Sequence, residues 1–139
     1  DLAFATTLPQ GEIDSYASIF AYQDGLAVQH ALIEVLNERA ENEVGWLETL
    51  ERSEIPTTLI WGELDAIAPV AVPDYVWTSY LKNGEAAADY WRIPCVDHYL
   101  QVDDPGLIAD ILRATLAQDP PPAEIEGQAC RTVQIQANH

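Results

Sequence analysis

A short apolar strand framed by proline and glycine constrains the fold of this chain more than any other feature. Residues 57–61 (Thr-Thr-Leu-Ile-Trp) follow Pro56 and precede Gly62, as is typical of a strand buried in a parallel sheet. A second strand is predicted over residues 89–94 (Asp-Tyr-Trp-Arg-Ile-Pro). The segment between the two runs is long enough for a loop and a helix.

Each predicted strand is followed by a predicted helix. A helix framed by proline is expected over residues 72–81, and Asn83-Gly84 ends it. Residues 104–116 carry the apolar spacing of a final helix, with Asp103 and Asp104 interpreted as its N-cap. Because strand and helix alternate, the sequence predicts an α/β fold.

The segments on either side of this region have other patterns. Residues 1–24 give no clean period and are expected to form loops and a short helix. Apolar residues recur at helical spacing over residues 26–36, and a further apolar stripe ends near Arg52, which fits a kinked helix or two consecutive helices. After Gln118 an Asp-Pro-Pro-Pro sequence predicts an extended linker and a poorly ordered tail, with a short edge strand at residues 132–135.

Two side chains at the predicted strand ends form a candidate acid–base pair. Asp65 follows the first strand and His98 follows the second, 33 positions later, so both are expected at the carboxyl end of neighbouring parallel strands. A carboxylate behind a histidine fixes the tautomer of the ring and stabilises its protonated form. The sequence therefore predicts a histidine base oriented by an aspartate.

Other polar residues near this pair are interpreted structurally. Asp97 is expected to be a solvated or capping carboxylate, and Cys95 a small buried side chain rather than a nucleophile. His30 and His139 have no spacing to a carboxylate or cysteine cluster that suggests zinc, and no phosphate loop or dinucleotide motif is present. We expect neither a metal nor a cofactor.

The motifs around the pair resemble the C-terminal portion of α/β-hydrolases. Residues 61–69 match a W-G-x-x-D-x-x-x-P loop that carries the triad acid in that family, and His98 matches its histidine loop. The His-Tyr-x-Gln run at 98–101 and the Asn-Glu-Arg-x-x-Asn-Glu-x-x-Trp-Leu run at 37–47 are similar to the epoxide-hydrolase and haloalkane-dehalogenase-like branch. The family pattern does not use Glu63, the rival acid in the first loop.

The resemblance implies a domain organisation and a gap in the catalytic machinery. It implies a cap-like helical segment at residues 1–43, part of a parallel hydrolase sheet with flanking helices at 44–118, and a Pro-rich tail at 119–139. In this fold the nucleophile precedes the acid in the chain. No G-x-S-x-G or G-x-D-x-G elbow precedes Asp65, and the serines upstream of it, Ser15, Ser18 and Ser53, do not lie between glycines.

The expected function follows from that gap. The resemblance implies a parent enzyme that hydrolyses an ester, an epoxide or a carbon–halogen bond of a small molecule through a covalent intermediate. The chain contains no methionine and begins at Asp1, so we interpret it as a piece whose complementary N-terminal hydrolase segment carries the nucleophile. Alone it is expected to be inactive. The alternative is a non-catalytic, hydrolase-like binding or regulatory protein.

Cap aromatic residues are a further feature that the resemblance singles out. Tyr16, Tyr22 and Trp46 are candidates to line a substrate pocket, but aromatic side chains also bury large areas in ordinary packing, so no role is assigned to them.

The charge of the chain bounds its partners. With 23 acidic and 6 basic residues the net charge is −17, so nucleic acid is not an expected partner, because phosphate binding needs clustered lysine and arginine. The excess is interpreted as a solubilising acidic surface. No apolar run is long enough to span a bilayer, and we expect a soluble protein, cytoplasmic rather than secreted.

Overall fold

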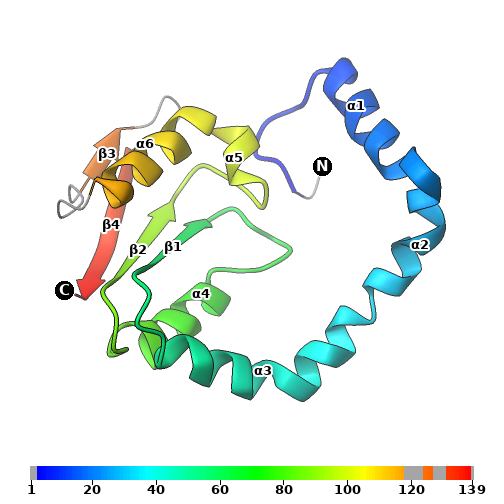
Figure 1. Cartoon of the computed structure of the whole chain (residues 1–139). Coiled ribbons are helices and arrows are strands. Elements are labelled where there is room, and N and C mark those ends of the chain that lie inside the picture. Colours follow the sequence, from blue (N-terminus) through cyan, green and yellow to red (C-terminus); the bar gives the residue numbers. More distant parts are fainter. Residues whose placement is uncertain (1–2, 118–123, 127–130, 139) are drawn as a thin grey trace.

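The computed structural model describes residues 3–117, 124–126 and 131–138, which form a mixed α/β fold (Figure 1). Strands β1 (Thr57–Gly62) and β2 (Ala88–Ile93) pair in parallel, in a register that runs from Thr57 opposite Ala88 to Gly62 opposite Ile93. Both predicted strands are present within one residue of their expected bounds, and the parallel pairing agrees with the expected α/β class.

The C-terminal strands make the sheet mixed rather than wholly parallel, which corrects the expectation of a parallel sheet. Strand β4 (Arg131–Asn138) pairs antiparallel with β2, and β3 (Glu124–Glu126) pairs antiparallel with β4, in the order β1-β2-β4-β3. The strand expected at residues 132–135 is therefore longer than predicted and lies between two others rather than at an edge. The rest of the predicted tail, at residues 119–123, 127–130 and 139, lies outside the described residues.

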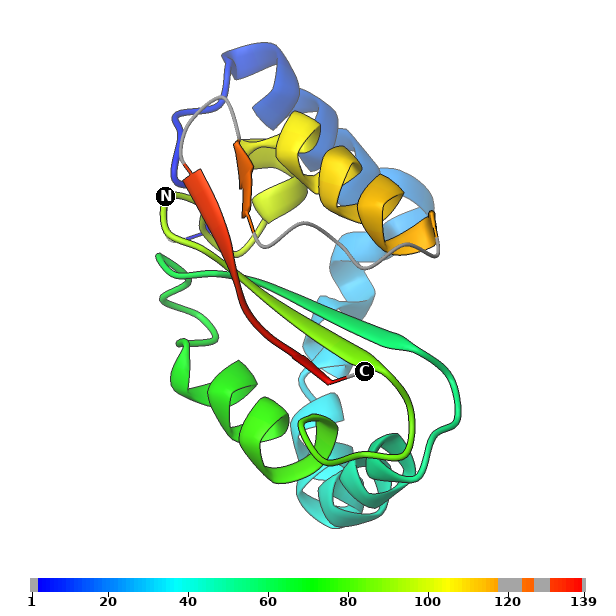
Figure 2. The same ribbon diagram turned by 90° about the vertical axis from the view of Figure 1, so that its left-hand side faces the viewer.

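Helices cover both faces of the strands. Helix α4 (Ala71–Val76) continues into the π-helical segment η2 (Trp77–Leu81), and together they match the helix predicted at 72–81. The short helix α5 (Leu100–Asp103) is followed by α6 (Pro105–Leu116), which matches the predicted final helix. Figure 2 shows the strands between α6, in yellow, and α4, in green.

The core consists of two clusters, one on each side of the sheet, because successive strand residues point to opposite faces. On the α6 side, Trp91 and Ile93 of β2 pack with helix residues including Ile111. On the other side, Tyr90 of β2 packs with Trp77 of η2. Strand β2 is almost wholly buried, whereas the residues of β1 before Gly62 are only partly buried. Within the described residues β1 is the outermost strand, so one of its edges has no strand partner.

The N-terminal helices form an arc that leaves the sheet and returns to it (Figure 1). The arc consists of α1 (Gln10–Ala21), the 3₁₀ turn η1 (Tyr22–Asp24), α2 (Gly25–Leu32) and α3 (Val35–Glu51), and none of its helices contains a buried residue. Helix α3 continues through the predicted domain boundary at residue 43, and the interruption between the two expected apolar stripes falls at residues 33–34.

The turn between α1 and α2 has a left-handed backbone. Gln23 and Asp24 have φ angles of 50° and 60°. A side chain at Gly25 would collide with the carbonyl oxygen of Phe20, so the chain can turn back this closely only because residue 25 is glycine. This turn sets the angle between α1 and α2.

The α6 cluster provides a test of the core. Ile111 is fully buried, so Ile111→Ala is expected to lower the free energy of unfolding by about 2–5 kcal/mol, as large-to-small substitutions in cores do. Leu116→Ala on the same helix, at a residue that is 79% exposed, is expected to change it by less than about 0.5 kcal/mol. Urea unfolding followed by tryptophan fluorescence measures both, and equal losses for the two variants would contradict the placement of the core.

Candidate active site

The candidate site is built where the loops after β1 and β2 meet. Glu63 N–H donates to the carbonyl of Ile93 at 2.9 Å, and Leu64 N–H donates to the carbonyl of Val96 at 3.1 Å. A Cβ on Gly62 would collide with the carbonyl oxygen of Val96, so glycine at the last position of β1 permits this close approach. The two loops are therefore fastened to each other before any side chain is considered.

Asp65 and His98 meet across these loops, as the sequence predicted. Asp65 Oδ2 lies 2.9 Å from His98 Nδ1. The other carboxylate oxygen, Oδ1, accepts hydrogen bonds from the backbone amides of Ile67 at 2.9 Å and Ala68 at 2.8 Å. One oxygen therefore holds the shape of its own loop while the second faces the imidazole ring.

The surroundings of Asp65 keep its carboxyl group ionised. Asp65 is only 6% exposed, and this burial by itself would raise its pKa. The hydrogen bond from Ala68, the hydrogen bond and charge of His98 and the hydrogen bond from Ile67 act in the opposite direction, and the net pKa of Asp65 is lowered from 3.8. Because an ionised carboxylate accepts but cannot donate, the contact with His98 requires a proton on Nδ1. That tautomer leaves Nε2 as the basic nitrogen.

The His98 ring is accessible to solvent, as a general base must be to reach its substrate. The His98 side chain is 35% exposed, whereas the carboxylate behind it is 5% exposed. The backbone amide of His98 donates to Asp97 Oδ1 at 2.7 Å, and the adjoining Tyr99 ring packs edge-on against the imidazole, with centroids 5.1 Å apart. The geometry matches a buried acid that orients a partly exposed base.

The structure corrects the interpretation of two aspartates near His98. Asp97 is buried rather than solvated, since its side chain accepts the His98 amide within the loop. Asp103 does not cap α6. Its carboxylate accepts instead from the amides of Asp97, Ala5 and Thr6, at 2.9 Å, 3.0 Å and 3.2 Å respectively. Asp104 is the cap, and it accepts from Leu107 N–H at 2.9 Å.

Glu63 forms an ion pair with Arg92 that was not predicted from the sequence. Its carboxylate lies 2.8 Å from Arg92 Nε, in an ion pair whose direction is too poor for a hydrogen bond. Arg92 also lies 3.5 Å from Asp74 of α4, and Asp74 accepts from the Tyr90 hydroxyl at 2.9 Å. Burial and this hydrogen bond raise the pKa of Tyr90. The cluster connects the Asp65 loop to α4, and an arginine within an apolar strand was the signal for it.

The side chains considered as nucleophiles are occupied elsewhere. The Ser15 and Ser18 hydroxyls donate to backbone carbonyls within α1, and the Ser53 hydroxyl accepts from the amide of Ile55. Cys95 is half-buried and disulfide-bonded, so it is neither the buried free thiol expected from the sequence nor a thiolate.

The described residues contain neither a metal-binding cluster nor a membrane-spanning helix. No cluster of histidine, cysteine and acidic side chains suited to a metal ion occurs among residues 3–117, 124–126 and 131–138. His30 is exposed, and His139 lies outside the described residues. In the same described ranges, no helix has the length and apolar character needed to cross a bilayer.

Comparison of the chain with protein-family models and with curated proteins yields no match. The assignment of this site therefore depends on its own geometry.

The lowered pKa of Asp65 predicts that the free energy of unfolding depends on pH. Because the folded-state pKa of Asp65 lies below its ordinary value of 3.8, its ionised form stabilises the fold above that pH, and this contribution disappears as the pH falls through the folded-state pKa. Asp65→Asn should therefore be less stable than the parent near neutral pH, and the difference should shrink in acid.

Urea unfolding at a series of pH values from about 7 down to about 3 measures this difference. Asp110→Asn on α6 is the control. It removes an exposed ion pair with Arg113, and exposed pairs contribute at most about 1 kcal/mol, so any convergence should be much smaller than for Asp65→Asn. A difference between parent and Asp65→Asn that is independent of pH would show that the carboxylate is not selectively stabilised in its ionised form.

Proposed function

We propose that this chain is the C-terminal portion of an α/β-hydrolase, in which Asp65 orients His98 and His98 acts as the general base. The observation that carries the proposal is the 2.9 Å contact between Asp65 Oδ2 and His98 Nδ1 at the carboxyl ends of two parallel strands. Ligands of open α/β sheets bind at that end of the strands. Covalent hydrolysis by an aspartate–histidine pair requires a buried, ionised acid and an accessible imidazole.

The proposed chemistry begins with an ester-type intermediate between the substrate and a nucleophile outside this chain. His98 Nε2 removes a proton from water while the water oxygen attacks the carbonyl carbon of the intermediate. The tetrahedral centre then collapses, the ester C–O bond breaks, and the proton on His98 passes to the oxygen that leaves. This oxygen is the hydroxyl of a serine nucleophile, or the oxygen of the alcohol product where the nucleophile is a carboxylate. Asp65 stabilises the imidazolium that exists between these two transfers. A serine nucleophile would also need His98 to activate it in the first step, whereas a carboxylate would not.

Among the described residues, β1 has no strand partner on the edge remote from β2, and this supports the proposal that a complementary segment completes the fold. In a parallel strand, alternate residues direct both backbone groups to the same side. Thr57 and Glu63 donate toward β2, so Leu59 and Trp61 also face β2, while Thr58 and Ile60 face the open edge. An apolar edge strand with its outward backbone groups unpaired can pair with a further strand.

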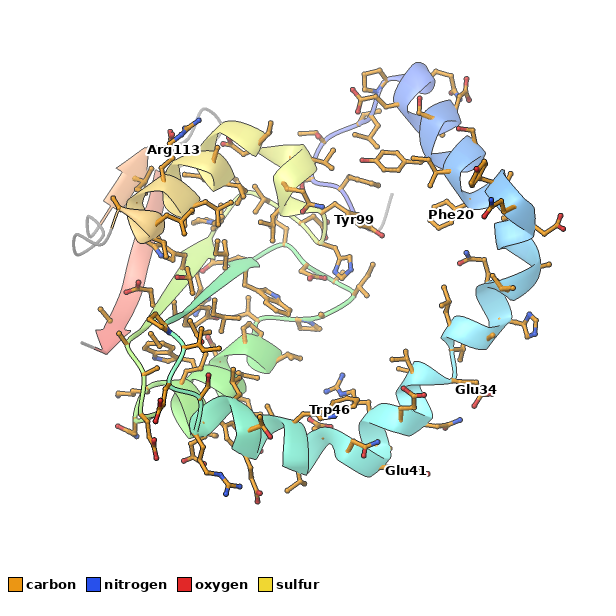
Figure 3. All side chains as sticks on the ribbon, viewed as in Figure 1. Phe20, Glu34, Glu41, Trp46, Tyr99 and Arg113 are labelled. Atoms are coloured by element: carbon orange, nitrogen blue, oxygen red, sulfur yellow. The ribbon has the colours of Figure 1, made fainter. Side chains whose placement is uncertain are left out.

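The arc of helices supports the same proposal. Its exposed large apolar residues are Ile13, Tyr16, Ile19, Phe20, Tyr22, Leu26, Val28, Leu32, Ile33, Val35, Leu36, Val44 and Trp46. Figure 3 shows Phe20 and Trp46 on the concave side of the arc, and Glu34 and Glu41 on the convex side. Isolated soluble domains rarely expose apolar side chains so densely. A hydrolase segment within the arc would cover the apolar residues of α2 and α3 on the concave side and leave the acidic side in water.

Amide exchange tests whether the β1 edge receives a strand. In the chain alone the amides of Thr58 and Ile60 should exchange much faster than those of Leu59 and Trp61, because the latter pair with β2. An added N-terminal hydrolase segment that carries the nucleophile elbow should slow exchange at Thr58 and Ile60. Protection of these amides in the chain alone would show that the edge is already occupied.

Complementation tests the catalytic roles. The chain mixed with that segment is expected to hydrolyse at least one of a nitrophenyl ester, an epoxide or a haloalkane. His98→Asn should abolish turnover, and Asp65→Asn should lower it by about 10³–10⁴-fold, since the ring would lose its tautomer and its counter-charge. Asp110→Asn, the exposed control, should retain full activity.

A folded complex that turns over none of the three substrates would defeat the proposal. The absence of a described nucleophile beside His98 favours one alternative, a hydrolase-like protein that binds or regulates without catalysis. For that alternative, His98→Ala would leave the biological activity unchanged.

A further inference from the structure

An aromatic cavity lies beside the candidate base. It has a volume of about 360 Å³, is partly open to solvent, and lies between the N-terminal segment, α1 and the loop after β2. Its lining residues are Phe4, Leu8, Ile13, Tyr16, Phe20 and Tyr99, all aliphatic or aromatic. Figure 3 shows Phe20 directed inward from α1, on the side of the molecule where Tyr99 lies.

Tyr99 is shared between the cavity and the acid–base pair. Its ring stands edge-on to the His98 imidazole and also stacks on Phe4, with centroids 4.9 Å apart and planes inclined by 21°. Phe4 in turn lies 6.2 Å from the ring of Tyr16 of α1. A continuous series of aromatic contacts therefore leads from His98 into the cavity.

Hydrogen bonds hold the cavity wall against the histidine loop. The Tyr99 amide donates to the carbonyl of Ala3 at 3.1 Å. The Asp103 carboxylate accepts from the N-terminal segment, through the amides of Ala5 and Thr6, and from the histidine loop, through the amide of Asp97. The cavity and the loop that carries His98 thus form one structural unit, and a group bound in the cavity would be held at a fixed distance from the imidazole.

We propose that this cavity binds the aryl-containing, uncharged part of the substrate, an inference that rests on the acid–base assignment of Asp65 and His98. Residues Tyr16, Phe20 and Tyr99 are 37%, 47% and 39% exposed, so an apolar ligand would cover surface that water now contacts. A cavity of about 150 Å³ accommodates benzene, so the cavity described here has room for one ring and a short chain.

Charge determines the class of ligand. The chain carries a net charge of −17, and Glu12 and Asp14 of α1 and Asp103 lie on the elements that enclose the cavity. A carboxylate ligand would be repelled by this field, whereas a neutral alcohol, ester or epoxide would not. The ligand class is therefore a neutral arylalkyl compound.

Binding of 3-phenylpropan-1-ol to the chain tests the proposal without any catalytic step. Saturable binding is expected, with changes in the aromatic NMR signals of Tyr99, Phe20 and His98. Tyr99→Ala and Phe20→Ala should each weaken binding at least about tenfold, a change of about 1.4 kcal/mol. The anion 3-phenylpropanoate should bind at least about tenfold more weakly than the alcohol.

Tyr22→Ala is the matched control. Tyr22 directly follows α1 and is 71% exposed, but it does not line the cavity, so its removal should leave binding unchanged. Far-ultraviolet circular dichroism of each variant verifies the fold, and Phe20→Ala removes a partly exposed ring outside the two core clusters.

Three results would overturn the inference. These are the absence of saturable binding at millimolar alcohol, binding unaffected by both Tyr99→Ala and Phe20→Ala, and loss of binding when the N-terminal hydrolase segment is added. The last result would show that protein, and not substrate, occupies the cavity. Because the assay needs no nucleophile, binding without activity in the complementation assay would leave the cavity assigned and defeat the hydrolase proposal, and activity without binding would do the reverse.

Discussion

The parallel pairing of β1 with β2 is the constraint from which the remaining structure follows. It places the two strand ends side by side, and glycine at residue 62 allows the loops beyond them to pack backbone against backbone. Asp65 and His98, one on each loop, meet there at 2.9 Å. The same pairing directs Trp91 and Ile93 to one helical layer and Tyr90 to the other, so a single strand register determines both the core and the site.

Elements with strong local signals could be predicted from the sequence. Strand β1 is bounded by proline and glycine, and α6 begins with an Asp-Pro pair that supplies both a cap and a favourable first turn. The pairing of Asp65 with His98 followed from the handedness and direction of a strand–helix–strand unit, which limits where each strand can end. Local chemistry and a general rule of topology were sufficient for these features.

Features that depend on contacts between distant residues could not be predicted. Asp103 and Asp104 are adjacent and chemically identical, yet one caps a helix and the other binds amides 97 and 98 residues earlier in the chain. Arg92 connects two acidic residues from different elements, which no spacing in the sequence reveals. The Pro-rich tail was predicted to be poorly ordered because its composition is unfavourable for a helix. Strand β4 nevertheless forms, because it pairs with β2 and satisfies the polar backbone groups of that strand.

The strand order has a consequence for how copies of this chain would aggregate. On one side the described sheet ends in β3, which has three residues, and on the other it ends in β1, which has six. Only the longer border offers enough unsatisfied peptide groups to bind a second chain firmly. Two copies that pair through their β1 edges would expose only their short β3 edges, so assembly would stop at a dimer and would not continue into a fibre.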